Sequence, residues 1–245
     1  MPENAVYDWD AFDSHDYVAR NYAVLSESDR RILETARDFF GGIADTAFPP
    51  GARGVDIGSG SNLYPALSML PFCDEISLLE HSASNVAWLR DQTALYSPLW
   101  DPYWELLATH DAYRRVVDPR AALAERARVR QVDLLADVDD GPWDVGTMFF
   151  VAESFSTSMA EFHAALRRFI GVLRSRAPFF IAFMENSQGY DVGELRFPAV
   201  AVERADVERA LCESAAQLTV ERIGTPGTPL RDGYTGMLVA HGTVK

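Results

Sequence analysis

A short apolar run that ends in a glycine turn is the feature that most constrains how this chain can fold. The run covers residues 54–57, Gly58-Ser59-Gly60 follows it directly, and a helical pattern begins at residues 63–70. Glycines let the backbone turn sharply and approach a ligand closely, and the start of a helix presents unpaired N–H groups. The segment therefore predicts a strand, a turn and a helix, with a ligand site at the turn.

The rest of the chain continues this alternation of strands and helices. Further strand patterns lie at residues 75–79, 129–132, 144–150, 179–184, 218–223 and 236–242. Helical patterns lie at residues 82–95, with Ser82 as N-cap, and at residues 118–127, 159–173 and 205–216. Strand–helix–strand crossovers produce parallel sheets covered on both faces, so the expected class is α/β. The last two strands have no helix between them, which predicts an antiparallel hairpin at one edge.

Composition narrows the class of protein and its partners. The 245 residues suit one large domain, and 22 basic against 36 acidic side chains give a net charge of −14, which disfavours nucleic acid as a partner. The two cysteines, Cys73 and Cys212, and the five scattered histidines show no metal-ligand spacing, so no metal is expected. The absence of a long apolar run and of a secretion signal predicts a cytoplasmic protein without a membrane span.

An acid at the end of the second expected strand adds to the glycine turn. Glu80 lies twenty-four residues after Asp56, where a carboxylate can accept both hydroxyls of a ribose. Leu63 stands where the dinucleotide fingerprint has its third glycine, which argues against NAD or FAD. S-adenosylmethionine fits better, with its ribose at Glu80, its adenine near Asp133 and its amino-acid end at the glycine turn.

The residues around this turn resemble those of a known family. Asp56-Ile57-Gly58-Ser59-Gly60 is followed by Tyr64, and Tyr17 and Tyr22 precede it. With the segment from Met184 to Phe197, this pattern resembles the nicotinamide, phenylethanolamine and thioether methyltransferase family from about residue 8 to residue 244. The resemblance implies S-adenosylmethionine as cofactor, a small-molecule acceptor, and a Rossmann-like core (52–245) in one domain with an amino-terminal helical cap (1–48). That core is a seven-stranded, mainly parallel sheet with helices on both faces.

The resemblance also assigns roles to individual residues. Tyr17, Tyr22 and Tyr64 would hold the methionine carboxylate of the cofactor. The full set expected to bind the cofactor is Tyr17, Tyr22, Asp56, Gly58, Ser59, Gly60, Tyr64, Glu80, His81, Asn85, Asp133 and Leu134. The residues expected to act in catalysis are Glu153, Glu185 and Tyr22.

The chain departs from the family pattern near the acceptor. Asn21 replaces one of the family's paired tyrosines, and the stretch from Glu185 to Tyr190 is about two residues shorter than in the nicotinamide enzyme. The resemblance therefore supports the assignment of the cofactor more strongly than any assignment of the acceptor. Methyl transfer from a sulfonium is an in-line displacement, for which a carboxylate such as Glu153 or Glu185 could orient an amine and take its proton.

Several assignments have plainer alternatives. Tyr17 and Tyr22 could be core residues, and the two catalytic acids could be solvated loop charges. The aromatic residues Trp100, Tyr103 and Trp104 could line an acceptor pocket or simply pack together. His81 could act as a base or lie on the surface. The protein could be a monomer or a homodimer.

Other functions also remain open at this stage. The same cofactor could serve O- or S-methylation, or cyclisation of the cofactor's own amino-acid chain. The chain could also be a non-catalytic regulatory protein, with the acceptor space filled by Phe149, Phe150 and Phe155. An NAD-dependent oxidoreductase is a further alternative.

Overall fold

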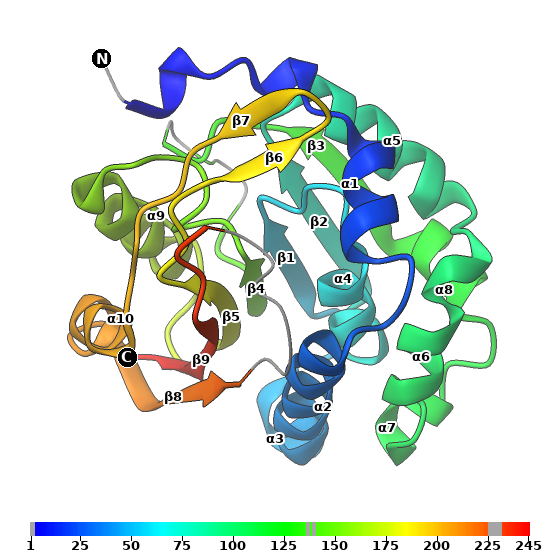
Figure 1. Cartoon of the computed structure of the whole chain (residues 1–245). Coiled ribbons are helices and arrows are strands. Elements are labelled where there is room, and N and C mark those ends of the chain that lie inside the picture. The colour runs from blue at the N-terminus through cyan, green and yellow to red at the C-terminus, as the bar shows by residue number, and fades with distance from the viewer. Residues whose placement is uncertain (1–2, 136–137, 139–140, 225–231) are drawn as a thin grey trace.

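The computed structural model describes residues 3–135, 138, 141–224 and 232–245. The strands are β1 (Arg53–Ile57), β2 (Glu75–Glu80), β3 (Ala127–Gln131), β4 (Val145–Phe149), β5 (Pro178–Glu185), β6 (Tyr190–Val192), β7 (Leu195–Phe197), β8 (Ala215–Ile223) and β9 (Gly236–Val244). Seven of them form one sheet in the order β3-β2-β1-β4-β5-β9-β8 (Figure 1). β1 to β5 pair in parallel, and β9 is antiparallel to both of its neighbours.

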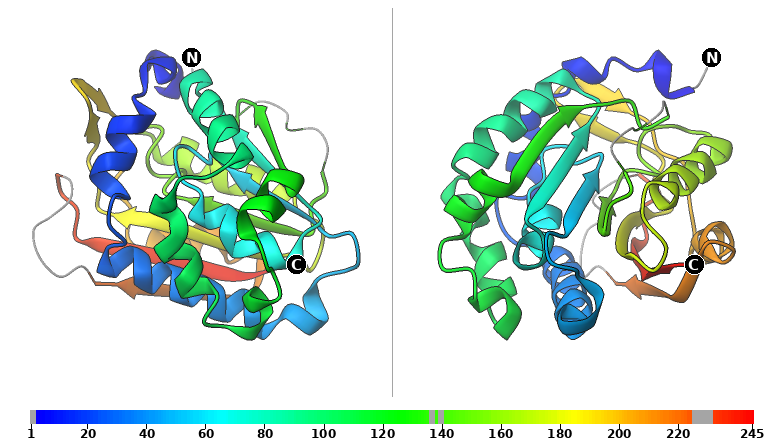
Figure 2. Two further views of the ribbon diagram at one scale, coloured as in Figure 1. Left: turned by 90° about the vertical axis from the view of Figure 1, so that its right-hand side faces the viewer. Right: turned by 180° about the vertical axis from the view of Figure 1, so that it is seen from behind.

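Helices cover both faces of this sheet (Figure 2). The α-helices are α1 (Ser14–Asn21), α2 (Glu27–Gly42), α3 (Ala44–Ala47), α4 (Tyr64–Met69), α5 (Ala83–Ala94), α6 (Asp101–Leu107), α7 (Asp111–Arg114), α8 (Pro119–Arg126), α9 (Met159–Gly171) and α10 (Arg204–Leu211). Short 3₁₀ turns are η1 (Glu3–Val6), η2 (Trp9–Ala11), η3 (Leu70–Phe72) and η4 (Pro98–Trp100). One core cluster lies between the sheet and α2, α4, α5, α6, α7 and α8, and a second lies between the sheet and α9 and α10.

Helix α2 is an integral part of the first core cluster. Its inward side chains, among them Ile32, Leu33 and Phe40, have no exposed surface. The segment from Arg31 to Phe40 with Ser28 before it predicts a helix capped by Ser28, but the helix begins at Glu27 and its N-cap is Ser26, whose hydroxyl accepts the N–H of Asp29.

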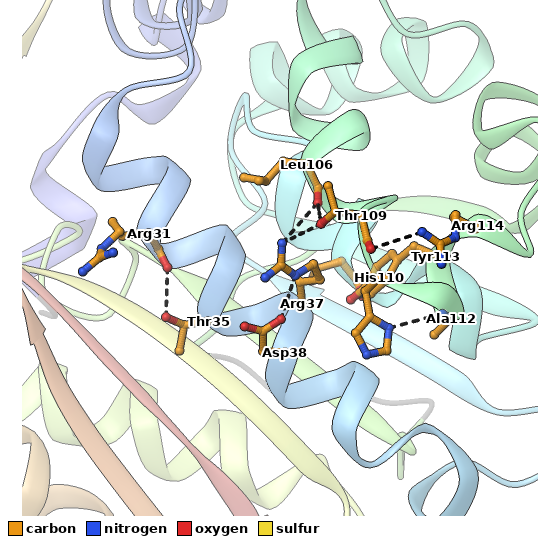
Figure 3. Close-up of polar contacts among 11 residues, drawn as sticks. Arg31, Thr35, Arg37, Asp38, Leu106, Thr109, His110, Ala112, Tyr113 and Arg114 are labelled. Atoms are coloured by element: carbon orange, nitrogen blue, oxygen red, sulfur yellow. Dashed lines mark hydrogen bonds and ion pairs between the residues drawn. The ribbon is translucent and has the colours of Figure 1, made fainter.

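A polar contact fastens the outer face of α2 to its neighbours. Arg37 donates from Nη1 to Oγ1 of Thr109, just beyond α6, at 2.6 Å and to the carbonyl of Leu106, within α6, at 3.5 Å (Figure 3). Gly41 packs directly on the His110 ring, which begins α7. α2 therefore belongs to the body of the domain and does not form a separate cover.

The segment that covers the carboxyl edge of the parallel strands is shorter than the expected cap. η2 and α1 lie beside the hairpin of β6 and β7, along the upper side of Figure 1. Phe12, Val192 and Phe197 form a small buried cluster between them. The Asp16 carboxylate accepts the N–H of Gly193 at 2.8 Å, which lowers the pKa of that carboxyl. Residues 9–21 and the β6–β7 hairpin, which are far apart in the sequence, thus form one cover over the carboxyl ends of the parallel strands. We call this cover the roof.

The fold expected from the sequence is confirmed: the central α/β sheet, its helices on both faces and the antiparallel strands at its edge are all present. Ser82 caps α5 as expected. The β6–β7 hairpin was not expected, because each of its strands has only three residues. Within the described residues, we find no helix that is long and apolar enough to span a membrane.

Candidate active site

The main cavity of the described structure lies at the carboxyl ends of the parallel strands, beneath the roof. Its wall runs from residues after β3, past the end of β2 and the glycine turn after β1, to residues after β4. η2, α1 and Tyr190 of β6 complete it from above. Ligands of open α/β sheets bind at this edge, where neighbouring connections leave the sheet in opposite directions.

The glycine turn forms the floor of the cavity. Gly58 and Gly60 have φ angles of +67° and +56°, in the left-handed region that favours glycine. A Cβ atom on Gly58 would lie 2.6 Å from Cγ1 of Val151, so the turn also needs glycine because of its close packing. The N–H groups of Gly58 and Ser59 donate to the carbonyl of Leu79 at 2.7 and 3.2 Å. The turn is thereby held against the end of β2.

Glu80 stands beside this turn with its carboxylate at the cavity wall. Its Oε2 accepts the N–H of Gly60 and its Oε1 accepts the N–H of Ser82, both at 2.8 Å. Burial raises the pKa of Glu80, while these backbone N–H groups and the side chain of Asn85 counteract that rise. The carboxylate faces the cavity, where it can accept hydroxyl groups of a ligand.

The other residues expected near the nucleoside also reach the cavity. Asn85 is buried in its wall, and its Oδ1 accepts the hydroxyl of Ser14 at 2.7 Å. Asp133, Leu134 and His81 line the far end, where Asp133 and His81 are exposed. The expected nucleoside residues thus lie along one side of one cavity.

Asp56 lies under the turn and does not line the cavity. Its side chain is buried, and Oδ1 accepts the hydroxyl of Thr147 at 2.7 Å. Burial, together with the nearby carboxylate of Glu80, raises the pKa of Asp56 to about 7. The Asp56 side chain therefore supports the glycine turn from beneath it.

Two polar residues that the sequence analysis did not single out also line the cavity. Ser61 and Asn62 follow the glycine turn and are almost completely buried. Asn62 Oδ1 accepts the N–H of Tyr64, but the Ser61 hydroxyl and the Asn62 amide nitrogen have no hydrogen-bond partner. Since buried polar atoms usually have a partner, these two atoms can donate to a polar group of a ligand in the cavity. In the sequence, their position directly after the glycine turn is the signal that could have identified them as cavity residues.

Of the three tyrosines expected at the amino-acid end of the cofactor, two line the cavity and one does not. Tyr17 and Tyr22 line the cavity. Tyr64 is fully buried behind them and does not line it, because its hydroxyl donates to Oδ1 of Asp29 at 3.1 Å. Burial raises the pKa of Asp29. Tyr64 contacts the ring of Tyr22 edge-on, with 6.0 Å between centroids, and so supports the cavity wall from behind.

The two acids expected to face the acceptor do not line the cavity. Glu153 is completely buried, and its Oε1 accepts the N–H of Met184 at 2.9 Å. Glu185 accepts Nε of Arg222 at 2.7 Å and the hydroxyl of Thr235 at 2.6 Å, beside a different surface hollow. Both side chains are bound to neighbouring groups of the protein in this structure.

Aromatic side chains form much of the cavity wall. Phe149, Phe150 and Phe155 lie at the end of β4 and just after it, and the other aromatic lining residues are Trp9, Phe12, Tyr17, Tyr22 and Tyr190. The three phenylalanines 149, 150 and 155 form part of this wall, and a cavity remains beside them. Trp100, Tyr103 and Trp104 are buried and do not line the cavity. Trp100 packs on Tyr22, Tyr103 on Tyr64 and Trp104 on Tyr113.

The fold matches that of solved methyltransferases. An N-methyltransferase, NodS from Bradyrhizobium japonicum WM9, solved with S-adenosyl-L-homocysteine, superposes with a TM-score of 0.56 over 94% of this chain and 98% of that chain, at 12% identity. A methyltransferase from Clostridium acetobutylicum gives a TM-score of 0.60 over 94% and 99%, at 10% identity. The fold is the Rossmann-like fold of S-adenosylmethionine-dependent methyltransferases.

Sequence comparison identifies the family within this class. The model of the NNMT/PNMT/TEMT family matches residues 4–228, and the chain belongs to that family. It is therefore an S-adenosylmethionine-dependent methyltransferase. Indolethylamine N-methyltransferase of Oryctolagus cuniculus is 25% identical over 180 residues, which cover 68% of each chain. The Mus musculus enzyme of the same name is 25% identical over 177 residues, covering 67% of this chain and 66% of that one.

Proposed function

We propose that this enzyme methylates the nitrogen of a small amine that has an apolar, flat body. The observation that carries this proposal is one cavity with polar residues around Glu80, at the end of β2, and with Phe149, Phe150 and Phe155 at the end of β4 and just after it; we call these parts the polar half and the aromatic half. The polar half suits the cofactor, and the aromatic half suits the acceptor. The two indolethylamine N-methyltransferase relatives support nitrogen as the acceptor atom.

The polar half fits S-adenosylmethionine group by group. Glu80, with Asn85 beside it, would accept the ribose hydroxyls. Leu134 and Asp133 would border the adenine. The Ser61 hydroxyl and the Asn62 amide, which lack partners within the protein, would donate to the carboxylate of the methionine part near Tyr17 and Tyr22. The bound cofactor supplies an electrophilic methyl group, and its C–S bond breaks as the new N–C bond forms.

The aromatic half would position the acceptor and exclude water. Flat rings on several sides fix the plane of a small apolar body, and holding two reactants in line accounts for much of the rate of such a displacement. A water-poor aromatic wall also lowers the pKa of a bound ammonium group. The nitrogen would then lose its proton to solvent and enter the reaction as a neutral amine. We propose that Glu153 and Glu185 support the structure, since neither carboxylate lines this wall.

Calorimetry followed by product analysis tests the proposal. The protein should bind S-adenosylmethionine and S-adenosylhomocysteine with one site per chain. Incubation with benzylamine or tryptamine should then yield the N-methylated amine and S-adenosylhomocysteine, measured by mass spectrometry. Methylation of phenol or thiophenol, with none of the amines, would contradict nitrogen as the acceptor atom. Methylthioadenosine formed without any acceptor would show cyclisation of the cofactor instead.

A further inference from the structure

The residue that follows β4 has a backbone conformation that side chains rarely adopt. Phe150 has a φ angle of +61°. Among the described residues, Arg176, Asn186 and Gln217 are the other non-glycine residues with a positive φ angle. Of these four, Phe150 lines the main cavity. Such a conformation is unusual for a bulky side chain and costs free energy, and strain of this kind concentrates at functional sites.

The neighbouring structure keeps Phe150 in this conformation. Its N–H donates to the carbonyl of Ala182 in β5 at 2.7 Å, so the backbone cannot turn without breaking a short hydrogen bond. Phe149, just before it, packs on the rings of Tyr64 and Phe180 with 5.3 and 5.5 Å between centroids. A glycine would satisfy the same backbone geometry without strain. The phenylalanine ring therefore has a role that the turn itself does not require.

The position of the ring indicates that role. β4 lies next to β1, on the side opposite to β2, so the residues after β4 are at the far end of the cavity from Glu80. If the nucleoside lies over β2 and the methionine part over the turn after β1, the methyl group points toward β4. Phe150 then stands where the acceptor must approach, with Phe155 and Tyr190 also on that wall.

We propose that Phe150 determines the size of the methyl acceptor, and that the strained backbone is retained to place its ring there. This inference rests on the proposed amine methyltransferase function. It predicts that a smaller side chain enlarges the acceptor space and leaves the cofactor half of the cavity unchanged. Apolar volume in a binding pocket discriminates between substrates by about ten- to two-hundredfold.

Thermal unfolding tests the strain by itself, without any substrate. At an ordinary position a glycine variant is less stable than the alanine variant. At a φ angle of +61° this order reverses, so the melting temperature of Phe150→Gly should be higher than that of Phe150→Ala. Phe155 provides the matched control, because it lines the same wall without a positive φ angle. At residue 155, the melting temperature of the glycine variant should be lower than that of the alanine variant. The same order at both positions would overturn the strain argument.

Methyl transfer to two primary amines that differ by one fused ring tests the size of the acceptor. The probes are benzylamine and 1-naphthylmethylamine. We expect the ratio of kcat/KM for the larger amine to that for the smaller one to rise about tenfold or more in Phe150→Ala relative to the unchanged protein. The Kd for S-adenosylhomocysteine should remain the same. An unchanged ratio, or a parallel loss of cofactor affinity, would overturn the assignment of Phe150.

These outcomes are separate from failure of the proposed function. If the unchanged protein binds the cofactor but methylates no amine, the proposed function fails, and the inference about the acceptor fails with it. If the unchanged protein methylates benzylamine and Phe150→Ala shows the same preference, only the inference about Phe150 fails. The melting order at residues 150 and 155 reports on strain in either case.

Discussion

The Oε2 atom of Glu80 lies 2.8 Å from the backbone nitrogen of Gly60 and accepts its N–H. This contact joins the end of β2 to the glycine turn after β1, so the residue expected to bind ribose also holds the turn in shape. The carboxylate is buried, yet its pKa is raised less than burial alone would require, because backbone N–H groups stabilise the charge. Cofactor binding and the geometry of the turn are therefore linked through one side chain.

Replacing Glu80 by glutamine should weaken cofactor binding. The amide can accept only one of the two backbone N–H groups, and its own NH₂ faces the other. We expect a loss of about 1–3 kcal/mol in the binding free energy of S-adenosylhomocysteine, measured by calorimetry. Glu75→Gln is the matched control, since Glu75 begins the same strand and pairs at the surface with Arg53. Equal affinities for both variants would contradict the ribose assignment.

The glycine turn can be tested by adding single methyl groups. Gly58→Ala and Gly60→Ala both place a side chain at a positive φ angle, which costs about 1–2 kcal/mol. Gly58→Ala also brings Cβ to 2.6 Å from Cγ1 of Val151, whereas the nearest atom to a Cβ on Gly60 is 3.8 Å away. Urea unfolding should therefore show the larger loss for Gly58→Ala. Adding Val151→Ala should recover the excess, and no recovery would argue against the close contact.

The buried carboxyl of Asp56 predicts a pH dependence of stability. Its pKa rises from 3.8 to about 7 on folding, so between these values the folded protein binds the proton that the unfolded chain has lost. The contribution of Asp56 to stability therefore falls as the pH rises from about 4 to about 7. Asp56→Asn resembles the neutral acid and should remove this slope. Urea midpoints of both proteins across the window measure the difference, and parallel curves would refute it.

The hydroxyl of Tyr64 predicts a separation of stability from cofactor binding. Tyr64→Phe removes the donor to the Oδ1 atom of the buried Asp29 carboxyl and leaves only the Ser26 hydroxyl at Oδ2, which should cost about 1–3 kcal/mol of unfolding free energy. Since Tyr64 does not line the cavity, the Kd for S-adenosylhomocysteine should change little. Asp29→Asn keeps an oxygen acceptor for the hydroxyl and should cost less. A large loss of affinity in Tyr64→Phe would show that the hydroxyl reaches the cofactor.

Much of the fold and of the cofactor side of the cavity could be predicted from the sequence, because the signals are local. Gly58 and Gly60 directly follow the apolar run of the first strand, and Glu80 ends the next strand. The placement of Tyr64 could not be predicted in this way. It depends on Asp29, thirty-five residues earlier in the chain, which takes the tyrosine hydroxyl in the folded state.

The acceptor side was harder to predict for a related reason. Glu185 ends β5, where an active-site acid could lie, but Arg222 from β8 pairs with it across β9. A sequence pattern shows which residues lie at the end of a strand. It does not show which side chain will form a hydrogen bond or an ion pair with them in the folded protein. The strain at Phe150 is also invisible in the sequence, since the backbone conformation depends on the contact with Ala182 in the neighbouring strand.

The roof over the cavity has a practical consequence for work with this protein. Residues 9–22 lie over the site, Asp16 is joined to the β6–β7 turn, and Asn4, near the start of the described residues, lines the cavity (Figure 1). The carboxyl terminus lies beyond β9, where Lys245 contacts the carbonyl of Cys212 away from the cavity. An affinity tag or fluorescent fusion should therefore be attached behind residue 245, where it leaves the entrance for small molecules clear.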